Sequence, residues 1–330
     1  MARQQKIVVC ATSFFDVLLT EPSKTGEAAR RLQSAAEERG FTVEYRCERN
    51  PLNPMSPEEL DSVTAVIADL EGYDRELLSR VGAAAGGSLE LISRYGTGCS
   101  SIDLDAAREY GVTVTNTPGV NALPMAEWAL GTMIDVAGRR IQHHERASTG
   151  KRKTGPSRID LSGKKVGILG TGFSGKYLAS LLSGFKADIY AYAPRPDKEW
   201  AEEQGVKYRE LEELCEISDF ISLHASASYE IIGRKEISRM KPTTVLVNCA
   251  RNVLVDNRAV WEAVRDGRLW GYGLDEVWEH EDMPLEGLNI ITTPHVGSDT
   301  DKGKLGMQMG SVQAVIDFIE GKIPKHCVTS

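Results

Sequence analysis

A glycine-rich turn between an apolar run and a helical pattern restricts the possible folds of this chain more than any other feature. The segment KKVGILGTGFSGKYLASLL (164–182) places Gly170, Gly172 and Gly175 directly after a short apolar run. Glycines at this spacing allow a tight turn, a close approach of the backbone to a pyrophosphate, and close packing of helix on strand. The N-terminus of the following helix also favours an anion. A second strand-like stretch, DIYAYA (188–193), follows in the expected order, so the sequence predicts a dinucleotide-binding domain.

Short apolar runs alternate with charged amphipathic stretches along almost the whole chain. Apolar runs without polar alternation, separated by helical patterns, are typical of a parallel sheet covered on both faces. The runs are KIVV (6–9), AVIA (65–68), LELIS (89–93), VGIL (166–169), DFISL (219–223) and TVLVN (244–248). The helical patterns cover residues 26–40, 103–111, 124–142 and 304–322, the last closed by Gly321. Because 330 residues exceed what one hydrophobic core usually organises, we expect an α/β protein with two domains.

Composition and charge argue against several functions. The formal charge of −8 disfavours nucleic acid or an anionic membrane as a partner, since phosphate binding draws on Lys and Arg. No apolar run approaches the roughly 18 residues of a membrane span, and the N-terminus MARQQKIVVC has no signal-peptide pattern. Six cysteines lie scattered without CxxC pairs, which suits free thiols better than disulfides or a zinc site. We therefore expect a cytoplasmic protein without a metal.

A polar, basic stretch follows the helical pattern at 124–142. It reads HHERASTGKRKTGPSRIDLSGKK and covers residues 143–165. Two interpretations are open at this point, a linker between the two halves of the chain or an arm that packs on a partner subunit.

The acid that normally holds the adenosine ribose of NAD is missing. It is expected about 20 residues after the glycines, at the end of the second strand, where it binds the ribose hydroxyls. This chain has Ala193 at that place and Arg195 two residues later. A guanidinium binds a phosphate through two hydrogen bonds, so the sequence favours NADP(H) over NAD(H). The alternative is that Arg195 is a solvated loop residue and that NAD(H) binds without the acid.

Arg, His and carboxylate side chains follow apolar runs in the second half of the chain. Arg251 comes just past TVLVN, His295 follows a proline after IITT (290–293), and acids cluster between them in GYGLDEVWEHEDMP (271–284). Ligands of open α/β sheets collect at the carboxyl ends of the strands. Each residue alone can be a surface or packing residue. Together, beside a nicotinamide site, they suit chemistry on a small anionic substrate.

With these motifs the sequence resembles the D-isomer-specific 2-hydroxyacid dehydrogenases, the family of phosphoglycerate, formate and phosphite dehydrogenases. RYGTGCSSIDLDAAREYGVTVTNTPGVNALPMAEWALG (94–131) is similar to the family's substrate-loop and hinge-helix region, and the glycine motif lies far from the N-terminus. The resemblance covers nearly the whole chain. It implies a Rossmann-type cofactor domain at 123–299, inserted into a flavodoxin-like substrate domain made from 1–122 and a C-terminal helix at 300–330. The active site would lie in the cleft between the domains.

The resemblance also implies roles for individual residues. Arg251 would clamp the substrate carboxylate, His295 would be the acid/base residue, and Asp275 would contact the nicotinamide amide. The implied substrate contacts are Thr97, Gly98, Cys99, Arg251 and His295. The implied cofactor contacts are Gly170, Gly172, Phe173, Ser174, Gly175, Ala193, Arg195, His224, Ala250 and Asp275.

The chain departs from the family pattern in four places. Asn252 replaces the usual Gly after the arginine, Ala225 replaces a frequent Pro, and the stretch 145–160 has no Trp. The fourth departure concerns the glutamate that partners the histidine, which usually falls five residues after the acid at 275, where this chain has a histidine. One inserted residue would make Glu281 the partner, and Glu279 is the alternative.

The implied reaction is reversible hydride transfer between C4 of the nicotinamide and C2 of a 2-oxo or 2-hydroxy acid of D configuration. A phosphorylated substrate needs basic partners near a strand end of the first domain, where this chain has Asp69 and Glu71. We therefore expect a small unphosphorylated 2-oxo acid such as glyoxylate or hydroxypyruvate, with D-3-phosphoglycerate as the alternative. The resemblance also implies a two-fold homodimer. A hypothesis of another class is a cofactor-sensing interaction protein, because the family includes transcriptional corepressors.

Overall fold

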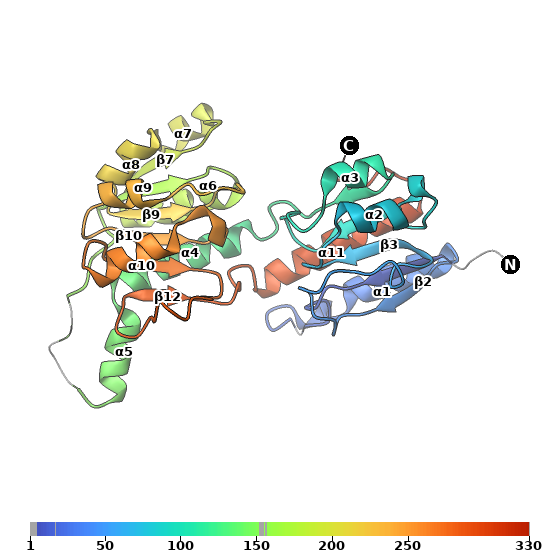
Figure 1. Cartoon of the computed structure of the whole chain (residues 1–330), viewed down its shortest axis with the longest axis horizontal. Coiled ribbons are helices and arrows are strands. Elements are labelled where there is room, and N and C mark those ends of the chain that lie inside the picture. Colours follow the sequence, from blue (N-terminus) through green and yellow to red (C-terminus); the bar gives the residue numbers. More distant parts are fainter. Residues whose placement is uncertain (1–4, 17, 152–154, 156, 330) are drawn as a thin grey trace. The chain divides into compact units, whose positions relative to one another are not determined.

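The computed structural model describes residues 5–16, 18–151, 155 and 157–329. The chain divides into two compact units (Figure 1). Unit 1 comprises Met1–Asn121 and Asp299–Ser330, and unit 2 comprises Ala122–Ser298. Each division falls next to the boundary that the resemblance implies.

Unit 1 is a five-stranded parallel sheet with helices on both faces (Figure 1). Its strand order, β2-β1-β3-β4-β5, is that of flavodoxin-like folds. The strands are β1 (Lys6–Val9), β2 (Thr42–Tyr45), β3 (Val63–Ala68), β4 (Leu91–Arg94) and β5 (Thr113–Thr115). The helices are α1 (Glu27–Glu38), α2 (Arg75–Val81), α3 (Leu104–Glu109) and α11 (Asp301–Ile319), with 3-10 turns at Pro22–Lys24 and Ala83–Ala85.

Alternate side chains of the unit 1 strands enter two separate cores. Ile7 and Val9 of β1 pack with α1 and α11, whereas Val8 between them packs on the other face with α2 and α3. Successive side chains of a strand point to opposite faces, so a strand covered on both sides needs no polar alternation. Helix α11 adds Val312 and Val315 to the first core. The end of the chain therefore completes a core that the start of the chain begins.

Unit 2 is a seven-stranded parallel sheet in the order β12-β11-β10-β9-β6-β7-β8. Counted from β6, this is the doubly wound order of dinucleotide-binding folds, extended by one strand. The strands are β6 (Lys165–Leu169), β7 (Asp188–Tyr192), β8 (Lys207–Tyr208), β9 (Phe220–Leu223), β10 (Val245–Asn248), β11 (Gly271–Leu274) and β12 (Ile290–Thr292). The helices are α4 (Ala122–Ala137), α5 (Arg140–Ser148), α6 (Phe173–Leu182), α7 (Lys198–Gln204), α8 (Leu211–Ile217), α9 (Arg234–Arg239) and α10 (Asn257–Arg265), with 3-10 turns at Ser183–Phe185 and Asn252–Leu254. The expected Rossmann-type and flavodoxin-like α/β architecture is confirmed.

The sequence predicts one helix over 124–142, and the structure has two. Helix α4 ends at Ala137 and α5 begins at Arg140, because Arg139 adopts the left-handed conformation with φ 46°. The Arg139 guanidinium lies 4.3 Å from the centroid of the Trp270 ring. The turn between the two helices therefore contacts the residue that directly precedes β11. Helix α5 extends to Ser148, so the stretch at 143–165 starts as a helix. Residues 152–154 and 156 of that stretch lie outside the described residues.

All six cysteines are free, as the sequence predicts. Across the described ranges, no helix combines the length and the apolar character needed to cross a membrane.

Candidate active site

The carboxyl ends of the unit 2 strands carry most of the side chains that the sequence singles out. All seven strands are parallel, so the residues that follow them lie at one edge of the sheet. The glycine turn follows β6, Ala193 follows β7, His224 follows β9, Ala250 and Arg251 follow β10, Asp275 follows β11, and His295 lies after β12. The strand order reverses between β6 and β9, which is where ligands of such sheets bind.

The glycine turn leaves no room for a side chain at two of its glycines. A Cβ on Gly170, where φ is 98°, would lie 2.7 Å from the backbone carbonyl of His224. A Cβ on Gly175 would lie 2.1 Å from the carbonyl oxygen of Gly170. Gly172 caps α6 without a side-chain hydrogen bond and has open space at its Cβ position, and the next residue, Phe173, is exposed. The N–H groups of the first turn of α6 are thus available to an anion, and the turn fits a dinucleotide pyrophosphate.

His224 holds a serine of the glycine turn. Its Nδ1 lies 3.0 Å from Ser174 Oγ, and its Nε2 lies 3.0 Å from Ser222 Oγ. The Cys249 thiol lies 3.4 Å from Nδ1 and donates to Leu223 O at 3.1 Å. Burial lowers the pKa of His224 from the usual 6.5 to about 4, so the ring is neutral at pH 7. His224 therefore shapes the turn through Ser174 rather than bringing a positive charge to it.

Ala193 and Arg195 follow β7, where an NAD site has its ribose-binding acid. The side chain of Arg195 is exposed. The acid that comes next, Asp197, caps α7 by accepting from Trp200 N at 3.1 Å, and it pairs with Lys176 at 2.5 Å. The hydrogen bond from Lys176 lowers the pKa of the Asp197 carboxyl. This acid is therefore engaged in local structure, while the guanidinium of Arg195 faces solvent.

Arg251 lies between β10 and the 3-10 turn at Asn252–Leu254. The buried Asn248, the last residue of β10, donates from Nδ2 to Arg251 O at 2.8 Å and accepts at Oδ1 from Ala250 N at 3.0 Å. The Arg251 guanidinium donates to Ala250 O at 2.7 Å. The Arg251 backbone is thus tied to the strand end, while the residue as a whole is only half-buried.

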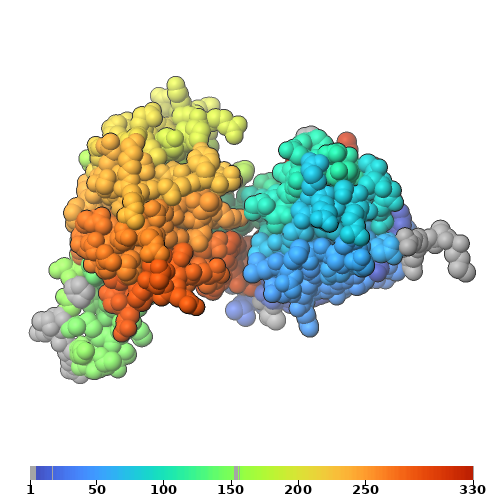
Figure 2. Space-filling view, viewed as in Figure 1, coloured from blue at the N-terminus to red at the C-terminus, as the bar shows by residue number. Residues whose placement is uncertain are grey.

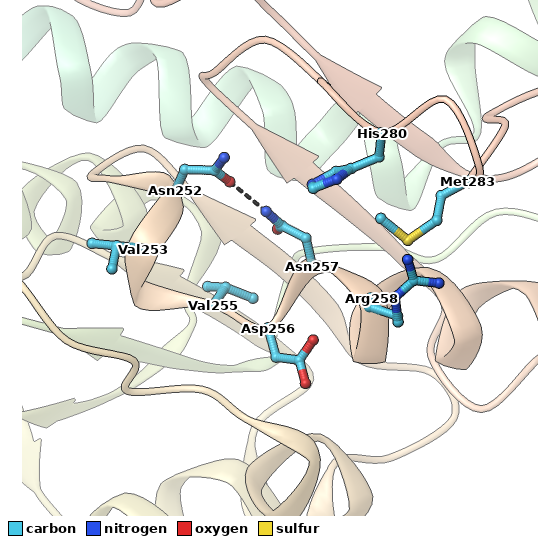
Figure 3. Close-up of a pocket in the computed structure, with 8 residues that line it drawn as sticks. All are labelled: Asn252, Val253, Val255, Asp256, Asn257, Arg258, His280 and Met283. Atoms are coloured by element: carbon cyan, nitrogen blue, oxygen red, sulfur yellow. Dashed lines mark hydrogen bonds between the residues drawn. The ribbon is translucent and has the colours of Figure 1, made fainter.

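Asn252, which replaces the usual glycine, adds a hydrogen-bond chain next to Arg251. Asn257 Nδ2 donates to Asn252 Oδ1, and the buried Tyr272 hydroxyl donates to Asn257 Oδ1 at 3.2 Å. Figure 3 shows the two amides pointing toward one another beside a pocket of about 490 Å³. The pocket is lined by Asn252, Val253, Val255, Asp256, Asn257, Arg258, His280 and Met283. Arg251 and His295 are not among these residues, so the pocket by itself does not identify the reaction site.

His295 forms a hydrogen bond with Glu276, which lies just past the end of the neighbouring strand β11. Its Nδ1 lies 3.0 Å from Glu276 Oε1. Glu281 and Glu279, the partners considered from the sequence, are exposed, and among the described residues neither forms a hydrogen bond or ion pair with His295. In this structure the partner of His295 is Glu276 instead of Glu281.

The register of β11 and β12 explains the pairing with Glu276. Leu274 pairs with Thr292, so the residues just beyond these two lie side by side. Glu276 comes two residues after Leu274, whereas Glu279 and Glu281 lie further along the loop that follows. The sequence thus contained one signal for Glu276, its position two residues after the run GYGL, but the family spacing predicts Glu281.

Asp275 is buried beside this pair, with 4% of its surface exposed. Its carboxylate accepts hydrogen bonds from Thr293, Val296 and Gly297, on both sides of His295. The implied contact between Asp275 and a nicotinamide amide stays a prediction.

The loop with the implied substrate contacts belongs to unit 1 and follows β4. The Nε of the buried Arg94 donates to Gly98 O at 3.0 Å, and the Thr97 hydroxyl donates to Thr117 O at 3.1 Å. Burial raises the pKa of the half-buried Cys99 thiol, which is therefore protonated at pH 7. Arg94, which no sequence motif singled out, thus supports the loop from within unit 1.

Comparisons with known proteins agree with this arrangement. Residues 130–297 match the family profile described as "D-isomer specific 2-hydroxyacid dehydrogenase, NAD binding domain". A glyoxylate reductase of Thermococcus litoralis is 34% identical over 82% of this chain and 84% of that protein. A D-3-phosphoglycerate dehydrogenase of Methanocaldococcus jannaschii is 34% identical over 73% of this chain and 47% of that protein. Among solved structures, a glyoxylate reductase from Paecilomyes thermophila is similar with a TM-score of 0.81, at 25% identity and 99% coverage of both chains.

Proposed function

This chain belongs to the family of D-isomer-specific 2-hydroxyacid dehydrogenases, and on that premise we propose that it acts on a small unphosphorylated 2-oxo acid with NADPH as the preferred cofactor. It is an NAD(P)-dependent oxidoreductase that transfers a hydride between a nicotinamide and a 2-oxo or 2-hydroxy acid. Glyoxylate and hydroxypyruvate are the proposed substrates. The observation that carries the proposal is that the glycine turn, Arg251 and His295 all follow parallel strands at one edge of unit 2.

The residues at that edge fit a nicotinamide dinucleotide. The glycine turn and the first turn of α6 would hold the pyrophosphate, with Ser174 oriented by His224. Arg195 would hold a 2′-phosphate, since Ala193 removes the charge that would repel it. When bound, the nicotinamide supplies or accepts the hydride.

Arg251 and His295 are the proposed catalytic residues. Arg251 would bind the substrate carboxylate and polarise the carbonyl oxygen at C2. His295 would give that oxygen a proton during reduction and take it back during oxidation. Because Nδ1 is engaged by Glu276, Nε2 is the ring nitrogen that would exchange this proton. The backbone of residues 97–99 is a further proposed contact of the substrate carboxylate.

Two acids at the end of β3 support an unphosphorylated substrate. Asp69 accepts hydrogen bonds from both the backbone N–H and the hydroxyl of Thr12, each at 2.8 Å. Glu71 is fully buried and accepts from the Tyr73 hydroxyl at 3.0 Å. A phosphate placed at this strand end would meet the partly exposed carboxylate of Asp69 instead of the cations that a phosphate needs. The second candidate is the oxidation of D-3-phosphoglycerate, the reaction in the name of the Methanocaldococcus jannaschii relative.

Initial rates on a small panel of 2-oxo acids test both parts of the proposal. The panel contains glyoxylate, hydroxypyruvate, pyruvate and 3-phosphohydroxypyruvate, each measured with NADPH and with NADH. We expect the highest kcat/KM for an unphosphorylated acid with NADPH. A higher value for 3-phosphohydroxypyruvate would contradict the substrate, and a higher value with NADH would contradict the cofactor, independently of one another.

We also propose that the protein forms a homodimer through unit 2. Helix α5 projects from that unit, as Figures 1 and 2 show, and its Ile141 side chain is 42% exposed. A projecting helix with an exposed apolar residue suits contact with a second copy, and two-fold dimers are the commonest oligomers. The six free thiols support a cytoplasmic location.

A further inference from the structure

The carboxylate of Asp275 accepts three hydrogen bonds from the turn that carries His295. Asp275 Oδ1 accepts from the Thr293 hydroxyl at 2.6 Å and from Val296 N at 2.8 Å. Asp275 Oδ2 accepts from Gly297 N at 2.7 Å. These donors lie before and after His295 in the chain, so the two oxygens of a single buried side chain span the whole turn.

His295 has a backbone conformation that needs such support. Its φ of 58° lies in the left-handed region, which is disfavoured for a residue with a Cβ and persists only where the surroundings determine it. Its own N–H donates to Thr293 O at 2.9 Å, which tightens the turn. A Cβ on Gly297 would lie 2.6 Å from Asp275 Oδ2, so glycine at this position is what lets the turn approach the carboxylate.

Asp275 also connects the His295 turn to the strand end of Arg251, through its backbone. The backbone N–H of Asp275 donates to Asn248 O at 3.1 Å. The Asn248 side chain, in turn, donates to Arg251 O. Two buried residues, Asn248 and Asp275, thus link the backbones of the proposed carboxylate-binding arginine and the proposed acid/base histidine.

We propose that Asp275 is a positioning residue for His295, whose left-handed turn and imidazole direction it maintains, while the adjacent Glu276 holds Nδ1 of the ring. The inference rests on the proposed role of His295 in proton transfer. It differs from the role that the family resemblance implies for Asp275, a contact with the nicotinamide carboxamide. The two roles predict different kinetic consequences.

Asp275→Asn is the direct test. An asparagine has one acceptor oxygen, and its NH₂ group would face a backbone N–H of the turn, so the turn should relax. We expect kcat for reduction to fall about 100-fold, as for a displaced catalytic group, while the NADPH Kd from fluorescence titration stays within about 2-fold. Asp282→Asn is the matched control, because Asp282 is an exposed acid of the same loop that pairs with Arg258, and it should leave kcat unchanged.

A cofactor analogue separates the two roles of Asp275. The 3-acetylpyridine analogue of NADPH has a methyl group in place of the carboxamide NH₂, so it cannot donate a hydrogen bond there. If Asp275 acts through His295, Asp275→Asn should lower kcat by the same factor with the analogue as with NADPH. If the loss disappears with the analogue, or if kcat with NADPH is unchanged, the inference is wrong.

Thr293→Val and His295→Asn complete the test. Thr293→Val removes one of the three donors with little change in shape, and we expect kcat to fall about 2- to 10-fold at an unchanged melting temperature. If Asp275→Asn does not fold, an unchanged kcat in Thr293→Val overturns the inference. His295→Asn should lower kcat by about 100- to 10,000-fold. Wild-type turnover in His295→Asn would instead contradict the proposed role of His295 itself.

Discussion

The imidazole of His295 and the carboxylate of Glu276 form a hydrogen bond of 3.0 Å between Nδ1 and Oε1, at the ends of the paired strands β12 and β11. Both side chains are partly exposed, with 38% and 26% of their surfaces accessible. The pair engages Nδ1, so Nε2 is the ring nitrogen left for the proposed proton transfer. Loss of the pair should therefore lower turnover.

Glu276→Ala should lower kcat for reduction by about tenfold, because the imidazole loses the hydrogen-bond partner that fixes its orientation. Glu276→Gln keeps one acceptor oxygen at this place and should lose less activity. Initial rates at saturating NADPH and 2-oxo acid measure both variants.

Glu281→Ala and Glu279→Ala are the controls for this prediction. Both side chains are exposed, and the two variants should keep the wild-type kcat. If Glu281→Ala lowers kcat and Glu276→Ala does not, Glu281 is the partner during turnover, as the family spacing implies.

Arg195→Ala should remove most of the preference for NADPH over NADH. A lost charge-assisted contact with the 2′-phosphate costs about 1.5–3 kcal/mol, or roughly ten- to a hundredfold in the ratio of the two kcat/KM values. Arg239→Ala removes a cation on α9 that pairs with Glu216, and it should leave the ratio unchanged. A wild-type enzyme that prefers NADH would show that Arg195 is a solvated loop residue.

Gly172→Ala and Gly175→Ala should separate cofactor binding from stability. A Cβ at Gly172 meets open space in the protein, so Gly172→Ala should fold normally but bind NADPH at least about tenfold more weakly, because the methyl group blocks the pyrophosphate. A Cβ at Gly175 would lie 2.1 Å from Gly170 O, so Gly175→Ala should lose about 1–3 kcal/mol in urea unfolding. Equal losses of stability in the two variants would contradict this distinction.

His224 should make the protein less stable as the pH falls below neutrality. Its pKa is about 4 in the folded protein and 6.5 in an exposed chain, so between these values the unfolded chain binds a proton that the folded protein does not. The free energy of unfolding should therefore fall by about 2 kcal/mol from this residue between pH 7 and pH 5. His224→Gln should reduce the difference between urea unfolding at the two pH values, whereas His144→Gln, at an exposed position, should not.

Light scattering at micromolar concentration should give the mass of a dimer. Ile141→Lys places a charge on the exposed apolar position of α5 and should shift the equilibrium toward the monomer. A monomeric wild-type protein at this concentration would rule out the proposed assembly.

The amino-acid sequence was sufficient for the architecture. Buried parallel strands leave an uninterrupted apolar pattern, and the glycine turn reports a backbone requirement that no other residue type meets, as the 2.1 Å contact at Gly175 shows. The two parallel sheets follow from such local signals, and the family and the chemistry of hydride transfer follow from the resemblance that the motifs carry. The break between α4 and α5 did not, because the left-handed residue at the break, Arg139, packs on the ring of Trp270, which is far away in the sequence.

The hydrogen-bond partners of His295 and of Asp275 were decided only by the tertiary structure. Both depend on the register between β11 and β12, which sets Leu274 opposite Thr292 and so brings Glu276 and Asp275 to the His295 turn. Spacing along the chain identified the acids of this loop as a group. It could not choose among them, because a hydrogen bond depends on the distance and direction between two side chains in space, and strand pairing determines both.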